Sequence, residues 1–317
     1  MLADRKVRGI VCFVAIAFGL AWLVALPLWL GDGLFDARFG TVALAVMSTP
    51  AMAALLMVFI IERPQGKARA LGLWPLRPVG RLFVYLGLGL VVPVALVLVA
   101  LPVGDVLGVY PGDFKTFSAF RMILNGQLLA AGQVELPLPI ETLVALQFVN
   151  VLIGAFINLV PALGEELGWR GWMLPRLMVY GPVKAIVISG VIWGAWHAPL
   201  VLLGYNYPMA PGWLGVLLMI GMCTLVGAVF GWLRLRSQSV WPAALAHGAF
   251  NAAAGFHLVF ASAGAPVNTT HGTILGWSGW IVPLVLVVVL VATKQFRHAA
   301  APQLPSQESA EAPASDR

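Results

Sequence analysis

Four stretches of the chain contain no Asp, Glu, Lys or Arg, and each is 23 residues long: residues 9–31, 39–61, 82–104 and 142–164. A helix of that length spans roughly 34 Å, enough to cross a hydrocarbon core of about 30 Å. Only 10% of all residues are charged, whereas soluble domains carry roughly 25%. The sequence therefore predicts an all-α, polytopic membrane bundle. Four further apolar segments bring the expected number of spans to eight: residues 185–203, 212–233, 240–261 and 275–293.

The basic residues are distributed unevenly between the two sides of such a bundle. With a cytoplasmic N-terminus, sixteen Lys and Arg fall in inside segments, and only Arg38, Lys115 and Arg121 fall outside. Cytoplasmic loops carry such an excess of basic residues. We therefore expect both termini in the cytoplasm and an integral protein of a plasma membrane, such as the bacterial inner membrane. Topology thus explains the net charge of +6, which gives no reason to expect a nucleic-acid partner.

The spans are predicted to form one membrane domain, residues 1–298, because no long linker divides them and no internal repeat is visible. Residues 299–317 are rich in Ala, Pro, Ser, Gln and Glu, a composition that predicts a disordered cytoplasmic tail. The long outside loop, residues 105–141, has an apolar stripe at helical spacing. That stripe predicts a helix that either lies in the outer membrane interface or packs on top of the bundle.

Three clusters of polar residues interrupt this apolar sequence. They read GEELGWRGW at residues 164–172, WGAWHAP at residues 193–199 and HGAFNAA at residues 247–253. An ionisable residue at membrane depth costs about 2.5–3.5 kcal/mol on insertion scales, and such residues usually serve a function. The three clusters are therefore the candidate site.

In the first cluster, Glu166 and Arg170 are four residues apart, with the acid first, and this spacing predicts an ion pair within one helix. Glu165 points about 100° away from Glu166 and has Trp169 at its own i+4 position. An unpaired carboxylate in a poorly hydrated place suits a general base. The alternative is that all three charges only mark the cytoplasmic end of a span.

The other two clusters each place a histidine on a helix beside a second functional side chain. His197 follows Trp193 by four residues, and Asn251 follows His247 by four residues. A histidine and an asparagine side by side can aim two hydrogen-bond donors at one developing oxyanion. Either histidine alone is also explained as a hydrogen bond between helices.

Taken together, EELGWR, WGAWH and HGAFN resemble the three motifs of the CAAX-processing and bacteriocin-immunity protease family, which includes the Rce1-type prenyl-protein endopeptidases and many bacterial Abi proteins. The resemblance covers about residues 148–254. One departure is Trp193, since Phe is frequent at that position in the family.

The resemblance implies an intramembrane endopeptidase acting on a membrane-associated or lipidated, CAAX-like protein. It implies that Glu165 and His197 activate a water molecule, that His247 and Asn251 form the oxyanion hole, and that Glu166 and Arg170 hold the site together. No cofactor is required on this interpretation. A zinc ion held by Glu165, His197 and His247 is the alternative, since a catalytic zinc usually has three protein ligands.

Two other classes of function use a polar core in a membrane bundle. One is a non-catalytic protein that binds a bacteriocin or a partner protein; the other is a secondary transporter, which the absence of an inverted repeat disfavours. A further expectation concerns depth, because His197 lies about 20 Å along its span at 1.5 Å per residue. Glu165 would otherwise end its span at the cytoplasmic edge. The two residues can meet if this span begins later than Thr142 and continues through the motif, so that Glu165 lies in a water-filled cavity.

Overall fold

A computed structural model describes residues 2–133 and 136–296 and, from residue 7 on, the burial of their side chains. This part of the chain is helical and has no strand; its one β-bridge joins Gly112 and Ala261. The longer helices are α1 (Leu2–Trp29), α2 (Phe39–Leu56), α4 (Val79–Val106), α5 (Ser118–Ala130), α6 (Ile140–Glu166), α8 (Pro182–Trp196), α10 (Gly212–Ser237), α11 (Trp241–Ala253) and α13 (Ile281–Ala292). The shorter helical segments are η1 (Gly33–Phe35), η2 (Met57–Ile61), α3 (Lys67–Ala70), η3 (Leu167–Met173), α7 (Leu174–Leu177), η4 (Met178–Tyr180), α9 (Ala198–Val201) and α12 (Phe256–Val259).

Five helical stretches of the described chain are long and apolar enough to cross a membrane: Val7–Trp29, Phe39–Ile61, Val79–Val106, Ile140–Tyr180 and Gly212–Ser237. The all-α, polytopic prediction is thus confirmed, but the count of eight spans is not. The other three expected spans correspond to α8, α11 and α13, which have 15, 13 and 12 residues. At 1.5 Å per residue these helices are only roughly 18–23 Å long.

The stretch that carries the first polar cluster differs from its expected bounds. It begins at Ile140, not after Thr142, so the expectation of a later start is wrong. The stretch does continue through the cluster, as expected, because α6 leads without a break into the π-helical segment η3 and on to Tyr180. The helix is therefore long enough to bring Glu165 into the bundle without a later start.

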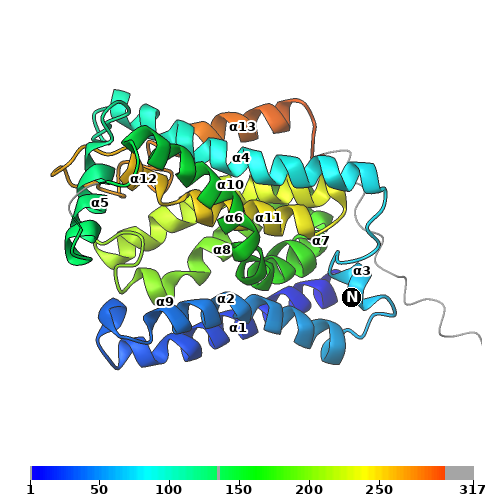
Figure 1. The fold of residues 1–317 in the computed structure, drawn as a ribbon. Helices are drawn as coiled ribbons and strands as arrows, with labels where there is room; N and C mark the ends of the chain where they lie inside the picture. Colours follow the sequence, from blue (N-terminus) through cyan, green and yellow to red (C-terminus); the bar gives the residue numbers. More distant parts are fainter. Residues whose placement is uncertain (1, 134–135, 297–317) are drawn as a thin grey trace, which may run out of the picture.

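Helix α11 is the centre of the packing: it lies against α6, α4 and α10, while α8 packs on α10, and α2 packs on both α1 and α6 (Figure 1). Small side chains allow these close approaches, as is common between membrane helices. Ala243, Ala246 and Ala249 of α11 are fully buried. At Gly248 a Cβ atom would lie 2.5 Å from the carbonyl oxygen of Ala155 on α6.

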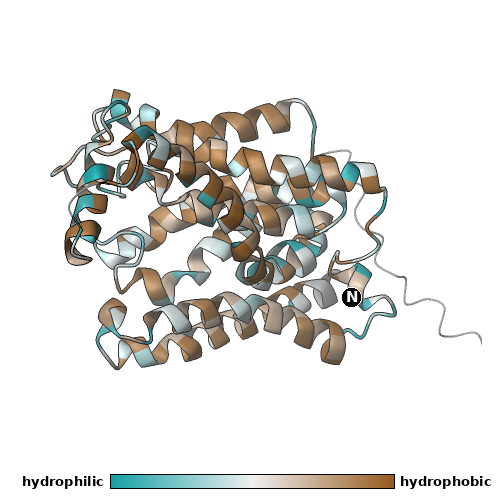
Figure 2. Cartoon of the chain, in the orientation of Figure 1, coloured by the Kyte–Doolittle hydropathy of each residue, from teal (hydrophilic) through white to brown (hydrophobic). Residues whose placement is uncertain are grey.

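The outward faces of the bundle are apolar, and hydrophilic residues gather mainly in the loops and at the helix ends (Figure 2). Large exposed apolar side chains lie on α1, α6 and α13, for example Leu23, Ile157 and Val288. Such surfaces suit a lipid environment rather than water.

Basic residues lie at one end of the bundle. The start of α1 and helices α3 and α7 lie at one end, and α5 and α12 lie at the other (Figure 1). The first end carries Lys67 and Arg69 on α3 and Arg176 on α7. The predicted tail, residues 299–317, lies outside the described residues.

Helix α5 resolves the two interpretations of the loop at residues 105–141. Phe120 on this helix is buried, and Leu124 packs against the main core. The rings of Phe114 and Phe117 lie 5.7 and 5.9 Å from the ring of Phe260, which follows α12. The apolar stripe therefore packs on the end of the bundle.

Candidate active site

Glu165 and Glu166 form the end of α6, and two glycines press this part of the helix against α2. A Cβ atom at Gly164 would lie 2.9 Å from the carbonyl oxygen of Met47, and one at Gly168 would lie 2.7 Å from that of Pro50. Only glycine permits such a close approach of two backbones. Since Met47 and Pro50 lie near the middle of the α2 stretch, the first polar cluster lies deep inside the bundle.

Directly after the two glutamates the helix changes to the π-helical segment η3, in which an N–H bonds the carbonyl five residues earlier. Leu174, for example, donates its backbone N–H to the carbonyl of Trp169. Segments of this kind are rare and often occur at functional sites. Arg170 lies in this segment, four residues after Glu166.

The ion pair between Glu166 and Arg170 is present, as their spacing predicts. Arg170 Nη1 donates to Glu166 Oε1 over 2.7 Å, and neither side chain is more than 1% exposed. The guanidinium carbon lies 4.2 Å from the centre of the Trp193 ring and 5.5 Å from that of Phe230. Aromatic faces attract a cation, most strongly where water is absent. Arg170 is therefore held by one carboxylate and two rings.

His247 of α11 bonds to the same carboxylate oxygen as Arg170. The distance from His247 Nδ1 to Glu166 Oε1 is 2.9 Å. Because Glu166 is paired with a guanidinium, its carboxylate accepts, and Nδ1 must carry the proton. The other ring nitrogen, Nε2, then points away from Glu166.

Glu165 uses its two oxygens differently. Oε2 accepts a hydrogen bond of 2.8 Å from the indole N–H of Trp193 on α8. Oε1 lies 4.0 Å from His247 Nε2, too far for a hydrogen bond. Glu165 and His247 are both almost fully buried. An oxygen atom placed between them could lie about 2.8 Å from each.

His197 lies directly after the end of α8 and is partly buried. Its Nδ1 is 2.9 Å from the carbonyl oxygen of Trp193, which can only accept, so Nδ1 carries the proton and Nε2 is an acceptor. The thiol of Cys223, on α10, lies 3.9 Å from the same Nδ1. Pro199 has no backbone N–H to continue the hydrogen bonds of α8, and it lies in the first turn of the next short helix, α9. Trp193 thus links His197 to Glu165.

Asn251 lies one turn beyond His247 on α11 and is partly buried. Its carboxamide has no hydrogen-bond partner in the described part of the chain. The structure therefore brings Glu165, Glu166, Arg170 and His247 into one cluster and joins His197 to it through Trp193. No side-chain hydrogen bond in the described chain joins Asn251 to this cluster. Its place near the cluster follows only from its position one turn after His247 on α11.

Sequence reasoning missed several residues around this cluster. Phe230 stacks on the His247 ring at 5.6 Å, but one Phe in an apolar helix gives no signal. Gly227 leaves room for Arg170, since a Cβ atom there would lie 2.6 Å from Nη2. The spacing of Gly227 and Gly231 could have indicated a helix interface. Trp193 was expected beside His197, but its bond to Glu165 was not foreseen.

Three of the sixteen basic residues counted in inside segments are buried within the bundle: Arg170, Arg176 and Arg234. Arg176 pairs with Glu62, which directly follows η2, at 2.5 Å. Arg234 donates from Nε to the carbonyl oxygen of Arg170 at 3.0 Å. These residues hold the helices around the cluster and are not loop charges.

The alternative zinc set, Glu165, His197 and His247, is not assembled in this structure. Within residues 2–133 and 136–296, no group of three or more His, Cys, Asp or Glu side chains is arranged to hold a metal ion. A catalytic zinc usually needs three protein ligands. The absence of a metal requirement stays a prediction.

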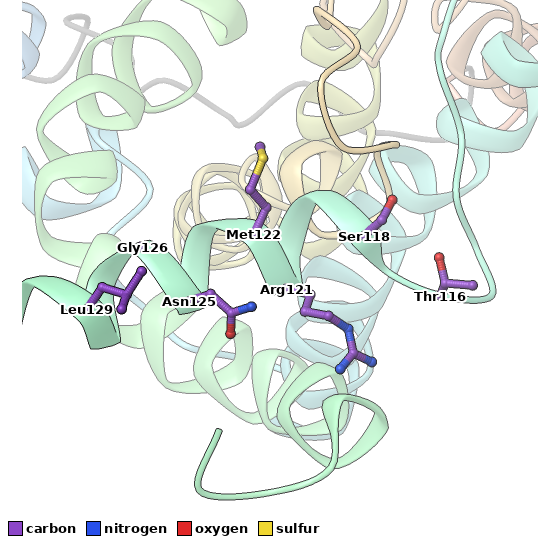
Figure 3. Close-up of a pocket in the computed structure, with 7 residues that line it drawn as sticks. All are labelled: Thr116, Ser118, Arg121, Met122, Asn125, Gly126 and Leu129. Atoms are coloured by element: carbon purple, nitrogen blue, oxygen red, sulfur yellow. The ribbon is translucent and has the colours of Figure 1, made fainter. Parts of the chain in front are cut away.

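A surface pocket of about 670 Å³ runs along α5 and the residues before it (Figure 3). It is lined by Thr116, Ser118, Arg121, Met122, Asn125, Gly126 and Leu129. None of the six predicted site residues lines it. The polar cluster and this pocket are separate features.

Comparison with known proteins agrees with the location of the cluster. Residues 147–253 match the family described as type II CAAX prenyl endopeptidase Rce1-like. The chain is similar to CAAX prenyl protease 2 of Methanococcus maripaludis, with 31% identity over 96 residues, or 29% of this chain. The matched part spans about a third (34%) of that relative's length. Residues 147–253, which carry the buried cluster, are thus the part of the chain that is similar to the Rce1-like family.

Proposed function

We propose that this protein is an intramembrane endopeptidase, and that it hydrolyses a peptide bond near the lipidated end of a membrane-associated protein. The observation that carries the proposal is the pair of free atoms Glu165 Oε1 and His247 Nε2, which face each other at 4.0 Å inside a membrane bundle. Burying two ionisable side chains inside a membrane bundle costs free energy, so such a pair usually serves a function.

Glu165 is the general base in this mechanism. Trp193 occupies Oε2, so Oε1 remains to take a proton from a water molecule. That water adds to the carbonyl carbon of the scissile bond, and Glu165 then passes the proton to the leaving nitrogen as the C–N bond breaks. His197 orients the same water, because its Nε2 is an acceptor fixed by the Nδ1 contact to the Trp193 carbonyl.

His247 and Asn251 serve the carbonyl oxygen, which becomes negatively charged when water adds. His247 Nδ1 is committed to Glu166, so only Nε2 can donate, and it does so in the imidazolium form. This form also balances the charge of the cluster: Glu165 and Glu166 carry two negative charges, and Arg170 and His247 carry two positive ones. Asn251 supplies the second donor from the next turn of α11.

Glu166 and Arg170 do not touch the reacting atoms in this mechanism. They fix the imidazole, because the carboxylate oxygen that accepts from His247 also accepts from Arg170. Removing either partner frees the ring to rotate away from Glu165. Both are therefore positioning residues.

The substrate class that we propose is supported by the names of the matched family and relative. The matched relative is named a CAAX prenyl protease, and the family is described as prenyl endopeptidases. We propose a prenylated or otherwise lipidated protein that reaches the cluster from the membrane, with the lipid bilayer as its second partner. We also propose that the end carrying α3 and α7 faces the cytoplasm and that the protein resides in the bacterial inner membrane.

The test is proteolysis of a library of lipidated and unlipidated C-terminal peptides by the purified protein in lipid nanodiscs. Wild type is compared with Glu165→Gln, which preserves shape and an acceptor for Trp193. We expect cleavage by wild type alone, at equal thermal stability of both proteins. Equal cleavage by both would reject Glu165 as the base. Peptide binding without cleavage by either protein would favour a partner-binding function.

A further inference from the structure

Arg234 is a buried cation that the mechanism above does not use. It lies near the end of α10 and is 1% exposed. It makes no ion pair with a carboxylate within the described residues, and its Nη1 has no hydrogen-bond partner there. Its one hydrogen bond in this part of the chain is from Nε to the carbonyl oxygen of Arg170. A guanidinium buried without an acid is costly, so this bond requires an explanation.

The explanation lies in the sequence of the π-helical segment. In this geometry each carbonyl accepts from the N–H five residues later, as Trp169 does from Leu174. The next carbonyl, that of Arg170, would accept from residue 175. That residue is Pro175, which has no N–H. The carbonyl of Arg170 is therefore without a backbone donor at the point where the helix returns to α-helical geometry in α7.

The loop after α3 covers the guanidinium of Arg234, which is 1% exposed. At Gly72 a Cβ atom would lie 2.6 Å from Arg234 Nη2. The Gly72 carbonyl in turn accepts from the backbone N–H of Val240 at 2.9 Å. Gly72 has φ of +71°, which favours glycine, so backbone rather than a side chain lies over Arg234.

We propose that Arg234 is a positioning residue of the active site, which replaces the N–H that Pro175 lacks and so fixes the backbone at Arg170. The link to the cluster is short. The side chain of Arg170 holds Glu166 at 2.7 Å, and the same oxygen of Glu166 holds His247 at 2.9 Å. The positioning role rests on the proposed function. The replacement of the missing Pro175 N–H by Arg234, called the pairing below, does not.

A double-mutant cycle tests the pairing. The variants are Arg234→Met, which removes the donor, Pro175→Ala, which restores a backbone N–H, and the two combined. Melting temperature in detergent is measured for all four proteins, together with hydrogen exchange of residues 167–176. We expect Arg234→Met to lower the melting temperature and speed exchange in the wild-type background. In the Pro175→Ala background both effects should fall to half or less. Equal effects in both backgrounds would overturn the proposal.

Arg236→Met is the matched control on the same helix. Arg236 is partly buried, and its Nε donates to the hydroxyl of Tyr85 at 3.2 Å. Its replacement should have the same effect in the wild-type and the Pro175→Ala backgrounds, because no orphan carbonyl is involved. If Arg234→Met alone does not fold, folding of the double variant supports the pairing. If neither folds, hydrogen exchange of Pro175→Ala alone decides: a protected amide at residue 175 supports the pairing, and an unprotected one overturns it.

Peptide cleavage supplies the readout specific to positioning. Arg234→Met should lower kcat at least tenfold and change KM less than threefold. Adding Pro175→Ala to this variant should restore at least half of the loss in log kcat. A purely structural effect would lower the folded fraction without changing kcat per folded molecule, and that result would overturn the positioning role. If wild type cleaves no peptide, the proposed function fails, while melting and exchange still decide the pairing.

Discussion

Glu165 and His247 face each other across 4.0 Å, and each has its other polar atom committed to a different partner. Trp193 donates to the far oxygen of Glu165, and Glu166 accepts from the far nitrogen of His247. Two side chains from helices far apart in sequence therefore present one free atom each to the same small space.

Loss of an oxyanion donor is expected to slow catalysis without unfolding the protein. Asn251→Ala removes a partly buried carboxamide that has no hydrogen-bond partner in the described chain. We expect a loss of about a hundredfold or more in kcat, as for other oxyanion donors, and a melting temperature close to that of wild type. Single-turnover cleavage assays measure the loss. Asn150→Ala, at an exposed site on α6, is the control, and comparable losses in both variants would contradict a role for Asn251.

Arg170→Ala is expected to destabilise the fold strongly, because it leaves Glu166 buried with half of its charge compensation removed. Breaking one half of a buried pair costs about 3–5 kcal/mol, whereas an exposed pair is worth under about 1 kcal/mol. Thermal unfolding in detergent is the measurement, with Arg121→Ala, an exposed arginine of α5, as the control. A melting temperature that Arg170→Ala leaves unchanged would mean that the ion pair is not formed in the protein.

Gly227→Ala tests the close packing around Arg170. A Cβ atom at Gly227 would lie 2.6 Å from Arg170 Nη2 and 3.3 Å from Trp193 Cε3. The guanidinium cannot move freely, because Glu166 and Trp193 hold it. We expect activity to fall at least tenfold and the melting temperature to decrease.

The control for this substitution is Gly19→Ala on α1, where a Cβ atom meets no other heavy atom within 4 Å. Alanine is favoured over glycine in a helix by up to about 1 kcal/mol, so this variant should be as stable as wild type or more stable. Equal behaviour of the two variants would argue against tight packing at Arg170.

The proposed orientation is tested by thiol labelling in intact cells. Arg69→Cys lies on α3 and Lys115→Cys lies before α5; both positions are exposed and they belong to opposite ends of the bundle. A membrane-impermeant thiol reagent should label Lys115→Cys in intact cells, and Arg69→Cys only after the membrane is made permeable. Wild type is the blank, since Cys12 is partly buried and Cys223 is buried. The opposite labelling pattern would reverse the topology.

Metal analysis addresses the zinc alternative. We expect purified, active protein to contain less than one zinc per chain and to keep its activity with a membrane-compatible chelator. If one zinc per chain is found, and its removal abolishes cleavage that added zinc restores, the water mechanism given above is wrong. His247 Nε2 and Glu165 Oε1 would then be the first candidate ligands.

The sequence alone determined the features that depend on composition or on neighbours along one helix. Charge-free stretches of 23 residues specify a membrane bundle, since an unpaired charge is costly in lipid. The i, i+4 spacing of Glu166 and Arg170 specifies their ion pair, because helix geometry brings such side chains together. The same spacing of His247 and Asn251 places them on one face of α11, whatever surrounds that helix.

Only the tertiary structure decided which atoms remain free to react and which charges are buried. The contact between Glu166 and His247 joins residues 81 positions apart, and that between Trp193 and Glu165 joins residues 28 apart. No periodicity predicts such pairs, because they depend on how the helices pack. Arg234 shows the same limit: its charge suggested a loop, yet packing buries it against a carbonyl that Pro175 leaves without a backbone donor. The chemistry of this cluster is therefore encoded locally by residue type but assembled by helix packing.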